Sequence, residues 1–128
     1  MSLEDCVPKD KFDLDAVRRA EEAGYPAIAP ILPELLEWMQ DMNWPVARVI
    51  APLLIKIGEP VVPLILEVLK GEDAIWKYWI LSSIVIDLDQ PTRAPLLGEC
   101  LRLTLHPTDA EKAEEVDLIA EEILLMSP

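Results

Sequence analysis

Glycine and histidine are scarce in this chain of 128 residues, which contains 4 glycines and a single histidine, His106. The glycines are too widely spread to form the phosphate-binding loops of nucleotide enzymes, because those loops need glycines at short, fixed spacing. His106 has no second histidine or cysteine at metal-ligand spacing. Cys100 lies six residues before His106, but it falls inside a predicted helix as a buried residue. We therefore expect no catalytic residues, no metal and no cofactor.

Cysteines and long apolar runs are also few. Only Cys6 and Cys100 are present, which predicts two free thiols in a reducing compartment rather than a disulfide framework. The N-terminus lacks the basic start and apolar middle of a signal peptide, so we expect a cytoplasmic protein. The most apolar stretches, 49–57 and 79–86, are shorter than the roughly 20 residues that span a bilayer. They indicate core helices rather than membrane spans.

Positive charge is scarce. The chain has 11 lysines and arginines against 24 aspartates and glutamates, a formal net charge of −13, while 52% of its residues are hydrophobic. Apolar and charged residues must therefore lie on separate faces of the helices for the protein to stay in solution. The acidic excess repels nucleic-acid phosphates and anionic lipids. It favours a protein partner, and in particular a basic one.

Proline is abundant, with 12 residues, and part of it forms a repeat. A proline is followed four residues later by glutamate in three segments, 33–37, 63–67 and 95–99, at spacings of 30 and 32 residues. A period of this length is typical of stacked helical pairs. Proline is tolerated in the first turn of a helix, so we interpret these prolines as helix starts. The glutamates of the second and third segments, with a basic residue at i+3, indicate the solvated surface pairs Glu67–Lys70 and Glu99–Arg102.

The periodicity and the caps predict an all-α fold of an N-terminal helix followed by about three antiparallel helix pairs. Residues 1–128 form one domain, of which 1–12 are expected to be a tail. Asp13, Asn43 and Asp73 are expected helix caps, and Thr108 begins a capping box. The helix from 74 to 88 has almost no polar side and should be covered around most of its circumference. The expected helices are 14–23, 33–42, 44–57, 61–70, 74–88, 93–105 and 109–126, with one short helical turn at 27–32.

Two segments carry a resemblance to known proteins: Leu35-Leu-Glu-Trp-Met-Gln-Asp-Met-Asn-Trp-Pro-Val-Ala47 and Ile75-Trp-Lys-Tyr-Trp-Ile80. With them the chain resembles HEAT-like helical repeat proteins and, over roughly residues 8–126, the family called domain of unknown function 5071. The resemblance implies a short HEAT-like α-α superhelix. It implies no activity, because none is established for that family.

The four tryptophans fall in corresponding parts of the first two repeats. Trp79 shares a stripe with isoleucines, which predicts a core position. Trp38 lies at the border of an acidic face and should show one edge to solvent. As large aromatics at helical spacing, the tryptophans are expected to fill the core. In the functional alternative, Trp44 and Trp76, which flank the two turns between paired helices, line an aromatic groove for a partner.

The few basic residues point to a second candidate surface. Arg48 and Lys56 share an exposed face of the helix 44–57. Lys77 follows Asp73 at i+4, which predicts an ion pair between them and a lysine whose stem packs along apolar neighbours. In the functional alternative, Arg48, Lys56 and Lys77 together line an inner face and capture a carboxylate or an acidic peptide.

The last helix is strongly acidic on one side, as expected for a solvated surface. Leu118 and Leu125 nevertheless lie on that acidic side, away from the apolar stripe of the helix. They either cover Leu105 or form a small association surface. We expect a monomer or a weak dimer.

These features favour a non-enzymatic protein–protein interaction module, for example a bacterial regulatory or immunity-type protein that neutralises a basic target. The alternative is a small-ligand or peptide pocket beneath Trp44 and Trp76. A HEAT-like DNA glycosylase is less favoured, because such enzymes need a broad basic face. The predicted partner-binding residues are Trp38, Trp44, Arg48, Lys56, Trp76 and Lys77, with Leu118 and Leu125 as the association surface.

Overall fold

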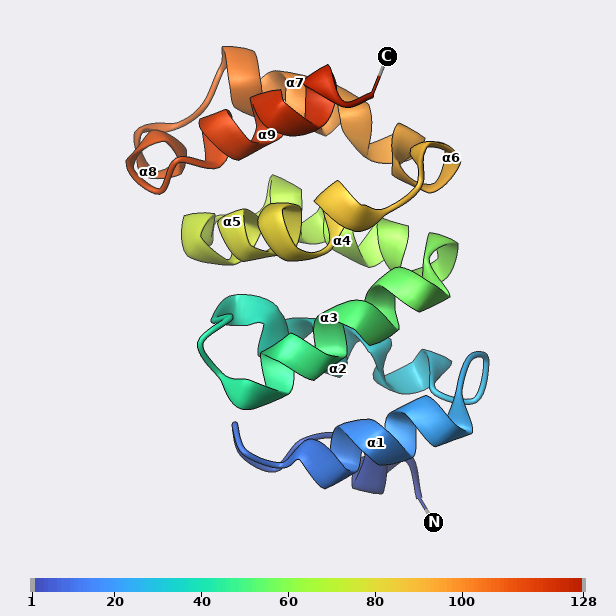
Figure 1. The fold of residues 1–128 in the computed structure, drawn as a ribbon. Coiled ribbons are helices and arrows are strands. Elements are labelled where there is room, and N and C mark those ends of the chain that lie inside the picture. Colours follow the sequence, from blue (N-terminus) through green and yellow to red (C-terminus); the bar gives the residue numbers. More distant parts are fainter. Residues whose placement is uncertain (1, 128) are drawn as a thin grey trace.

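The computed structural model describes residues 2–127, and within them it contains helices, turns and loops but no strand. The helices are stacked in chain order, with the N-terminus at one end of the stack and the C-terminus at the other (Figure 1). Packing joins elements of the same pair, such as the helices Leu97–Leu105 and Val116–Leu125, and elements of adjacent pairs, such as Ala74–Ser83 and Val116–Leu125. This arrangement confirms the predicted all-α class.

The N-terminal segment is packed against the stack. A 3-10 helix, η1 (Leu3–Cys6), contacts the first α-helix, α1 (Leu14–Ala23). Cys6 is fully buried, so residues 3–6 belong to the folded structure and not to the expected tail. The predicted cap at Asp13 is confirmed, because its side chain accepts a hydrogen bond from the Ala16 N–H. At the other end, Gly24 terminates α1 at φ 69°.

The first helix of each pair is built in the same way three times: a 3-10 turn leads directly into an α-helix. Prolines occupy the early positions of these segments, where a missing N–H costs no hydrogen bond, as predicted. The three segments are η2 (Ala29–Ile31) with α2 (Leu32–Glu37), η4 (Glu59–Val61) with α4 (Val62–Lys70), and η6 (Ala94–Leu96) with α7 (Leu97–Leu105).

The second members of the pairs differ more from the predicted boundaries. Asn43 is not a helix cap, because α3 begins one residue later than expected, with Trp44 in the cap position. Three predicted helices, 33–42, 74–88 and 109–126, are each interrupted. The helices not yet named are η3 (Trp38–Gln40), α3 (Pro45–Ile57), α5 (Ala74–Ser83), η5 (Val85–Asp87), α6 (Gln90–Arg93), α8 (Asp109–Ala113) and α9 (Val116–Leu125).

The predicted helix 74–88 is interrupted after Ser83. Ile84 leaves the helical region, with φ −122° and ψ −62°, and the chain continues as the 3-10 turn η5. Ile84 and Val85, at this interruption, are both fully buried.

The helix α3 contains Pro52 in its interior, on an exposed position. Proline cannot donate to the carbonyl four residues earlier, so one hydrogen bond of the helix is missing there. Among residues 2–127, no single helix is long and apolar enough to cross a membrane. The segment 45–57 passes that test only together with 59–70, and the two are bent by 111°.

Aliphatic side chains form the core. One continuous cluster of buried residues runs from Cys6 to Ile123 and links all the helical pairs. Its largest fully buried members include Leu35, Ile50, Leu54, Ile65 and Ile80. No aromatic residue is among the buried ones, although the chain has seven.

Candidate functional site

All the aromatic side chains of this protein reach the surface. Phe12 and Tyr25 are 67% and 49% exposed, and the other five aromatic residues are half-buried. The prediction that Trp79 lies in the core is therefore wrong. The expectation that this helix is covered around most of its circumference is confirmed for α5, since Ile75, 49% exposed, is its one exposed residue. Aromatic residues are usually among the large side chains that fill cores and interfaces. Here none is fully buried, although Trp38, Trp44, Trp76 and Tyr78 pack against the core cluster from the surface.

Six of the seven aromatic residues follow one edge of the stack. Trp38 and Trp44 contact each other edge to face, with ring centroids 5.5 Å apart, and η3, which carries Trp38, packs against α5. On α5, the rings of Tyr78 and Trp79 are 5.3 Å apart. The backbone hydrogen bond from Val46 N–H to Lys11 C=O places the neighbouring Phe12 beside the start of α3. We call this surface the aromatic edge: Phe12, Trp38, Trp44, Trp76, Tyr78 and Trp79.

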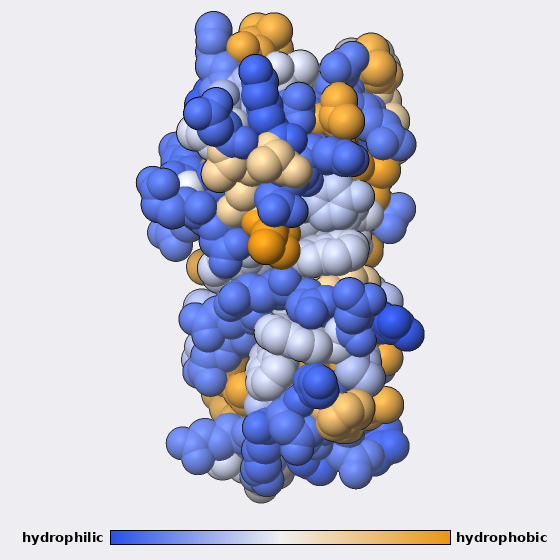
Figure 2. All heavy atoms as spheres, turned by 90° about the vertical axis from the view of Figure 1, so that its left-hand side faces the viewer, coloured by the Kyte–Doolittle hydropathy of each residue, from blue (hydrophilic) through white to orange (hydrophobic). Residues whose placement is uncertain are grey.

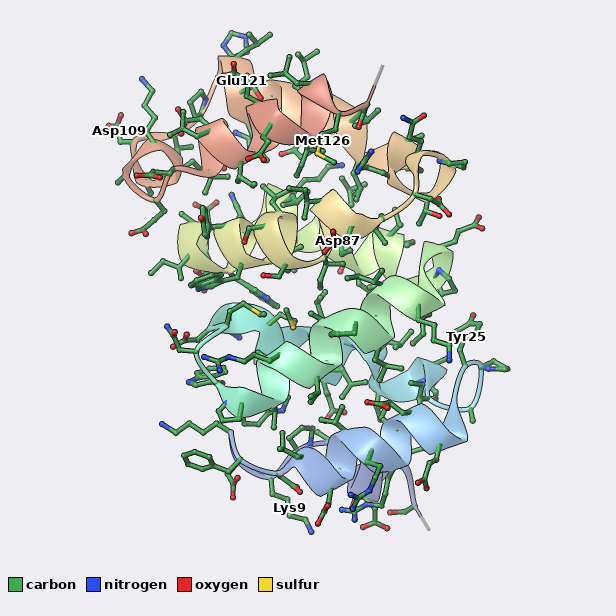
Figure 3. The ribbon with its side chains drawn as sticks, viewed as in Figure 1. Lys9, Tyr25, Asp87, Asp109, Glu121 and Met126 are labelled. Carbon is green, nitrogen blue, oxygen red and sulfur yellow. The ribbon has the colours of Figure 1, made fainter. Side chains whose placement is uncertain are left out.

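The aromatic edge coincides with the turns that join the helices of each pair. In Figure 1 these turns and α8 lie on the left-hand side. Figure 2 views the molecule from that side and shows a hydrophilic surface broken by pale and orange areas. Tyr25, the seventh aromatic residue, lies at the opposite edge (Figure 3). Six aromatic residues therefore lie on one side of the stack and one lies on the other.

A groove of about 300 Å³ opens between α2 and α4, next to the aromatic edge. Trp76 closes one end, and its indole N–H donates a hydrogen bond of 3.1 Å to the Leu36 carbonyl oxygen. Trp44 does not line this groove, so the structure does not place Trp44 and Trp76 over one pocket as predicted. We call it the acid-rimmed groove; apolar Pro33, Leu36, Leu64, Val68 and Trp76 line it together with Glu37, Glu67, Gly71, Glu72 and Asp73.

The three predicted basic residues do not meet on one face. Arg48 is exposed and lies at the aromatic edge, where its Nε donates to the Met42 carbonyl oxygen at 3.2 Å. Lys56 is exposed near the other end of α3, about 18 Å along the helix from Trp44 at 1.5 Å per residue. Lys77 is buried, with 3% of its surface exposed. A shared carboxylate site of these three residues is therefore not formed.

Lys77 belongs instead to a buried ion cluster. Its Nζ lies 2.7 Å from an Oε of Glu111, 34 residues later in the chain, and not beside Asp73. The predicted Asp73–Lys77 pair is wrong, because the Asp73 side chain caps α5 by accepting from the Trp76 N–H. Glu111 also accepts from both terminal nitrogens of Arg102, at 3.0 and 2.9 Å. The ion cluster consists of Lys77, Glu99, Arg102 and Glu111.

The charges of the ion cluster stabilise one another. The hydrogen bonds from Arg102, opposed by burial and aided by Lys77, lower the pKa of Glu111 to about 2. The hydrogen bond to Glu111 raises the pKa of Arg102 above its ordinary value. Glu99 accepts from the Arg102 Nε at 2.8 Å, so the predicted Glu99–Arg102 pair is present, but it is a partly buried member of the cluster and not a solvated pair.

The ion cluster fastens the segment 106–115, which contains α8, to the stack. Glu111 is the one buried side chain among these ten residues. The predicted capping box is confirmed, because the Glu111 N–H donates to the Thr108 hydroxyl and the Thr108 N–H donates to the Glu111 carboxylate. The Glu111 carboxylate thus both caps α8 and belongs to the ion cluster. A polar anchor therefore holds a segment that buries no apolar side chain of its own.

We predict that Glu115→Gly stabilises the protein. Glu115, between α8 and α9, has φ 60° and ψ 26°, a left-handed conformation that costs a non-glycine residue about 1 kcal/mol. Glycine adopts it without strain but loses more conformational entropy on folding, so we expect a net gain of up to about 1 kcal/mol. Thermal unfolding measures it. Glu114→Gly, at negative φ, should destabilise, and a loss of stability in Glu115→Gly would contradict the prediction.

The last helical pair exposes several leucines at the end of the stack. Leu118 and Leu125 on α9 are 57% and 80% exposed, as expected from their position on the acidic side. Leu105 on α7 is itself 61% exposed, so they do not cover it. Leu101, also on α7, is 49% exposed. The association surface at Leu118 and Leu125 remains a prediction.

Several residues of these surfaces were missed at the sequence level. Phe12 lies outside every predicted helix, and Tyr78 was hidden within the apolar run of α5. Glu111 was read only as a capping residue, because its partners Lys77 and Arg102 come from other helices. Cys100 is buried as expected, and burial raises the pKa of its thiol to about 11, which leaves it unreactive at neutral pH. No three His, Cys, Asp or Glu side chains among residues 2–127 are close enough to hold a metal ion.

Comparison with known proteins identifies a family but no characterised relative. A family model described as a domain of unknown function matches residues 6–124, nearly the whole chain. No curated protein matches the sequence. The matched residues include the helices that carry the aromatic edge, the acid-rimmed groove and the ion cluster. The chain belongs to the family of domain of unknown function 5071 (DUF5071).

Proposed function

We propose that this protein is a non-enzymatic protein–protein interaction module whose partner docks on the aromatic edge. The observation that carries the proposal is the distribution of aromatic residues: none is buried, and six of seven share one edge of the stack. Tryptophan and tyrosine are the residue types that most often dominate binding energy at protein interfaces. Keeping them at the surface exposes apolar area to water, which a bound partner would cover.

The charge around the aromatic edge favours a basic partner. A second groove of about 300 Å³, between Ile75, Tyr78 and Trp79 on one side and Ala113, Glu114 and Glu115 on the other, joins apolar and acidic groups. The net charge of −13 attracts a basic protein over a distance and speeds its association. A bacterial regulatory or immunity-type protein that neutralises a basic target fits these properties.

The architecture that presents this edge is, in our proposal, a short HEAT-like superhelix. The three 3-10 and α-helix units with early prolines, stacked in chain order, support it. In such a stack the turns between paired helices align along one edge, which gives an extended binding surface. We further propose that the protein acts in the cytoplasm, a reducing compartment that suits its two free cysteines. We also propose that it binds no nucleic acid, because its net charge of −13 repels phosphates.

A quantitative pull-down from lysate of the source cells tests the proposed function. Trp79→Ala and Phe12→Ser change side chains that do not pack against the core cluster, and we expect at least a tenfold loss of the specific partner. Tyr25→Ala is the matched control, an exposed aromatic residue at the opposite edge, and should retain the partner. Equal thermal stability of the three variants verifies folding. If no captured protein distinguishes the edge variants from the control, the proposal fails.

A small-ligand or peptide site is the second candidate, and one observation favours it: the acid-rimmed groove with Trp76 at its end. Its volume of about 300 Å³ is at the lower end of the range for ligand pockets. A thermal-shift screen would show such a ligand as stabilisation that is lost in Trp76→Phe.

A further inference from the structure

We propose that the acid-rimmed groove receives an arginine side chain of the protein partner. This inference deepens the proposed function and rests on it. It names the chemical group that the groove selects. It is argued from the repeat, because in the third helical pair Glu99, the repeat equivalent of Glu67, accepts a hydrogen bond from a guanidinium group.

The third repeat contains an internal example of such a complex. Glu99 stands in the repeated proline-to-glutamate segment, and its Oε1 accepts from the Nε of Arg102 at 2.8 Å. Glu111 comes from another segment and takes the two terminal nitrogens of Arg102. Two carboxylates therefore enclose one guanidinium at the junction between the second and third pairs.

The junction between the first and second pairs has the carboxylates but no cation. Glu37 and Glu67 are the repeat equivalents of Glu99, at spacings of 30 and 32 residues, and both line the acid-rimmed groove. No ion pair of either glutamate is formed among residues 2–127, and no basic residue lines the groove. Glu72 adds a third carboxylate from the turn before α5.

Lys70 does not occupy this groove, although it is the repeat equivalent of Arg102. It lines the neighbouring cavity of about 410 Å³, beside the ion cluster. The predicted Glu67–Lys70 surface pair is not formed among the described residues. Glu67 therefore faces the groove with its charge unpaired, which makes an external cation favourable there.

The apolar floor of the groove suits the rest of an arginine side chain. Leu36, Leu64 and Val68 offer contacts for its methylene groups, and the Trp76 ring lies at the end of the groove, where a guanidinium plane can stack on it. A guanidinium binds two carboxylates at once through its fork of N–H groups, whereas an ammonium acts as a point charge. We therefore expect arginine to be preferred to lysine.

The test uses two short blocked peptides, acetyl-Ala-Arg-Ala-amide and acetyl-Ala-Lys-Ala-amide, titrated into the whole protein and followed by NMR. The indole N–H signal of Trp76, assigned by its absence in Trp76→Phe, should shift on addition of the arginine peptide. We expect at least fivefold weaker binding of the lysine peptide. The double variant Glu37→Gln and Glu67→Gln should weaken the arginine peptide about tenfold, while Glu21→Gln, an exposed glutamate on α1, should not change it.

Two results would overturn the inference: equal binding of the two peptides, or arginine binding that persists in the double variant. Failure of this inference and failure of the proposed function give different results. If the partner captured from lysate is lost in Trp79→Ala but retained in the double variant, the aromatic edge stands and the arginine site does not. If the arginine peptide binds the groove but no partner depends on the edge, the proposed function fails alone.

Discussion

Glu111→Gln should lower the free energy of unfolding by about 3–5 kcal/mol, the range for removing one partner of a buried ion pair. The change leaves Lys77, 3% exposed, without a counter-charge, and it leaves one acceptor oxygen where Arg102 now has two. It also detaches segment 106–115, whose single buried side chain is Glu111. Chemical denaturation measures the loss, and thermal unfolding should shift by on the order of 10 °C.

Glu114→Gln is the matched control, because Glu114 lies in the same segment but is exposed, and it should change stability by less than about 0.5 kcal/mol. The combined variant Lys77→Met and Glu111→Met separates charge from packing. Replacing both members of a buried pair by apolar residues is often neutral, so the double variant should be more stable than Glu111→Gln. A Glu111→Gln protein as stable as the control would show that the cluster does not anchor the segment.

The stability of the protein should fall steeply with acid, and Glu111 should account for a large part of the fall. The pKa of Glu111 is about 2 in the folded protein, against 4.5 for an ordinary glutamate. The unfolded chain therefore binds the proton first as the pH decreases. The stabilisation by Glu111 is complete well above pH 4.5 and is lost as the pH falls from there to about 2, a change on the order of 3 kcal/mol.

Urea unfolding at pH 7, 4.5 and 3 of the wild type and of Glu111→Gln measures this contribution. The difference in unfolding free energy between the two proteins should shrink as the pH falls. Hydrogen bonds also lower the pKa values of Asp13 and Asp89, but these groups are present in both proteins and cancel in the difference. A difference that is independent of pH would contradict the assignment of the low pKa to Glu111.

Local sequence signals predicted the helix starts well. Proline in the first turn, Asp13 and Asp73 as caps, and the Thr108 capping box all act within four residues, so the sequence contains both partners of each interaction. The helix interruptions were not predicted. At Ile84 the chain leaves the helical region within a continuous apolar run, and the sequence around it contains no proline or glycine that would signal an end.

The candidate site was predicted in part. The turns between paired helices were correctly chosen as the place of Trp44 and Trp76, because aromatic residues at equivalent repeat positions can be aligned in the sequence. Which rings share a groove was not predictable, since Trp44 turns to Trp38 while Trp76 reaches Leu36, 40 residues away. The same holds for Lys77, whose expected partner at i+4 was available locally but whose actual partner is on α8.

The sequence by itself determined the helical class, the repeat, the positions of most helix starts and the excess of negative charge, because these depend on periodicity, on caps within one helical turn and on composition. The tertiary structure alone decided that no aromatic residue is fully buried and that six of them follow one edge. It also decided that Glu37 and Glu67 border a groove without a basic residue while Glu99 pairs with Arg102, and that Glu111 anchors α8. The reason is physical: each of these features joins residues from different helices, and a pairing across 34 or 40 residues is set by how the helices pack and not by any spacing along the chain.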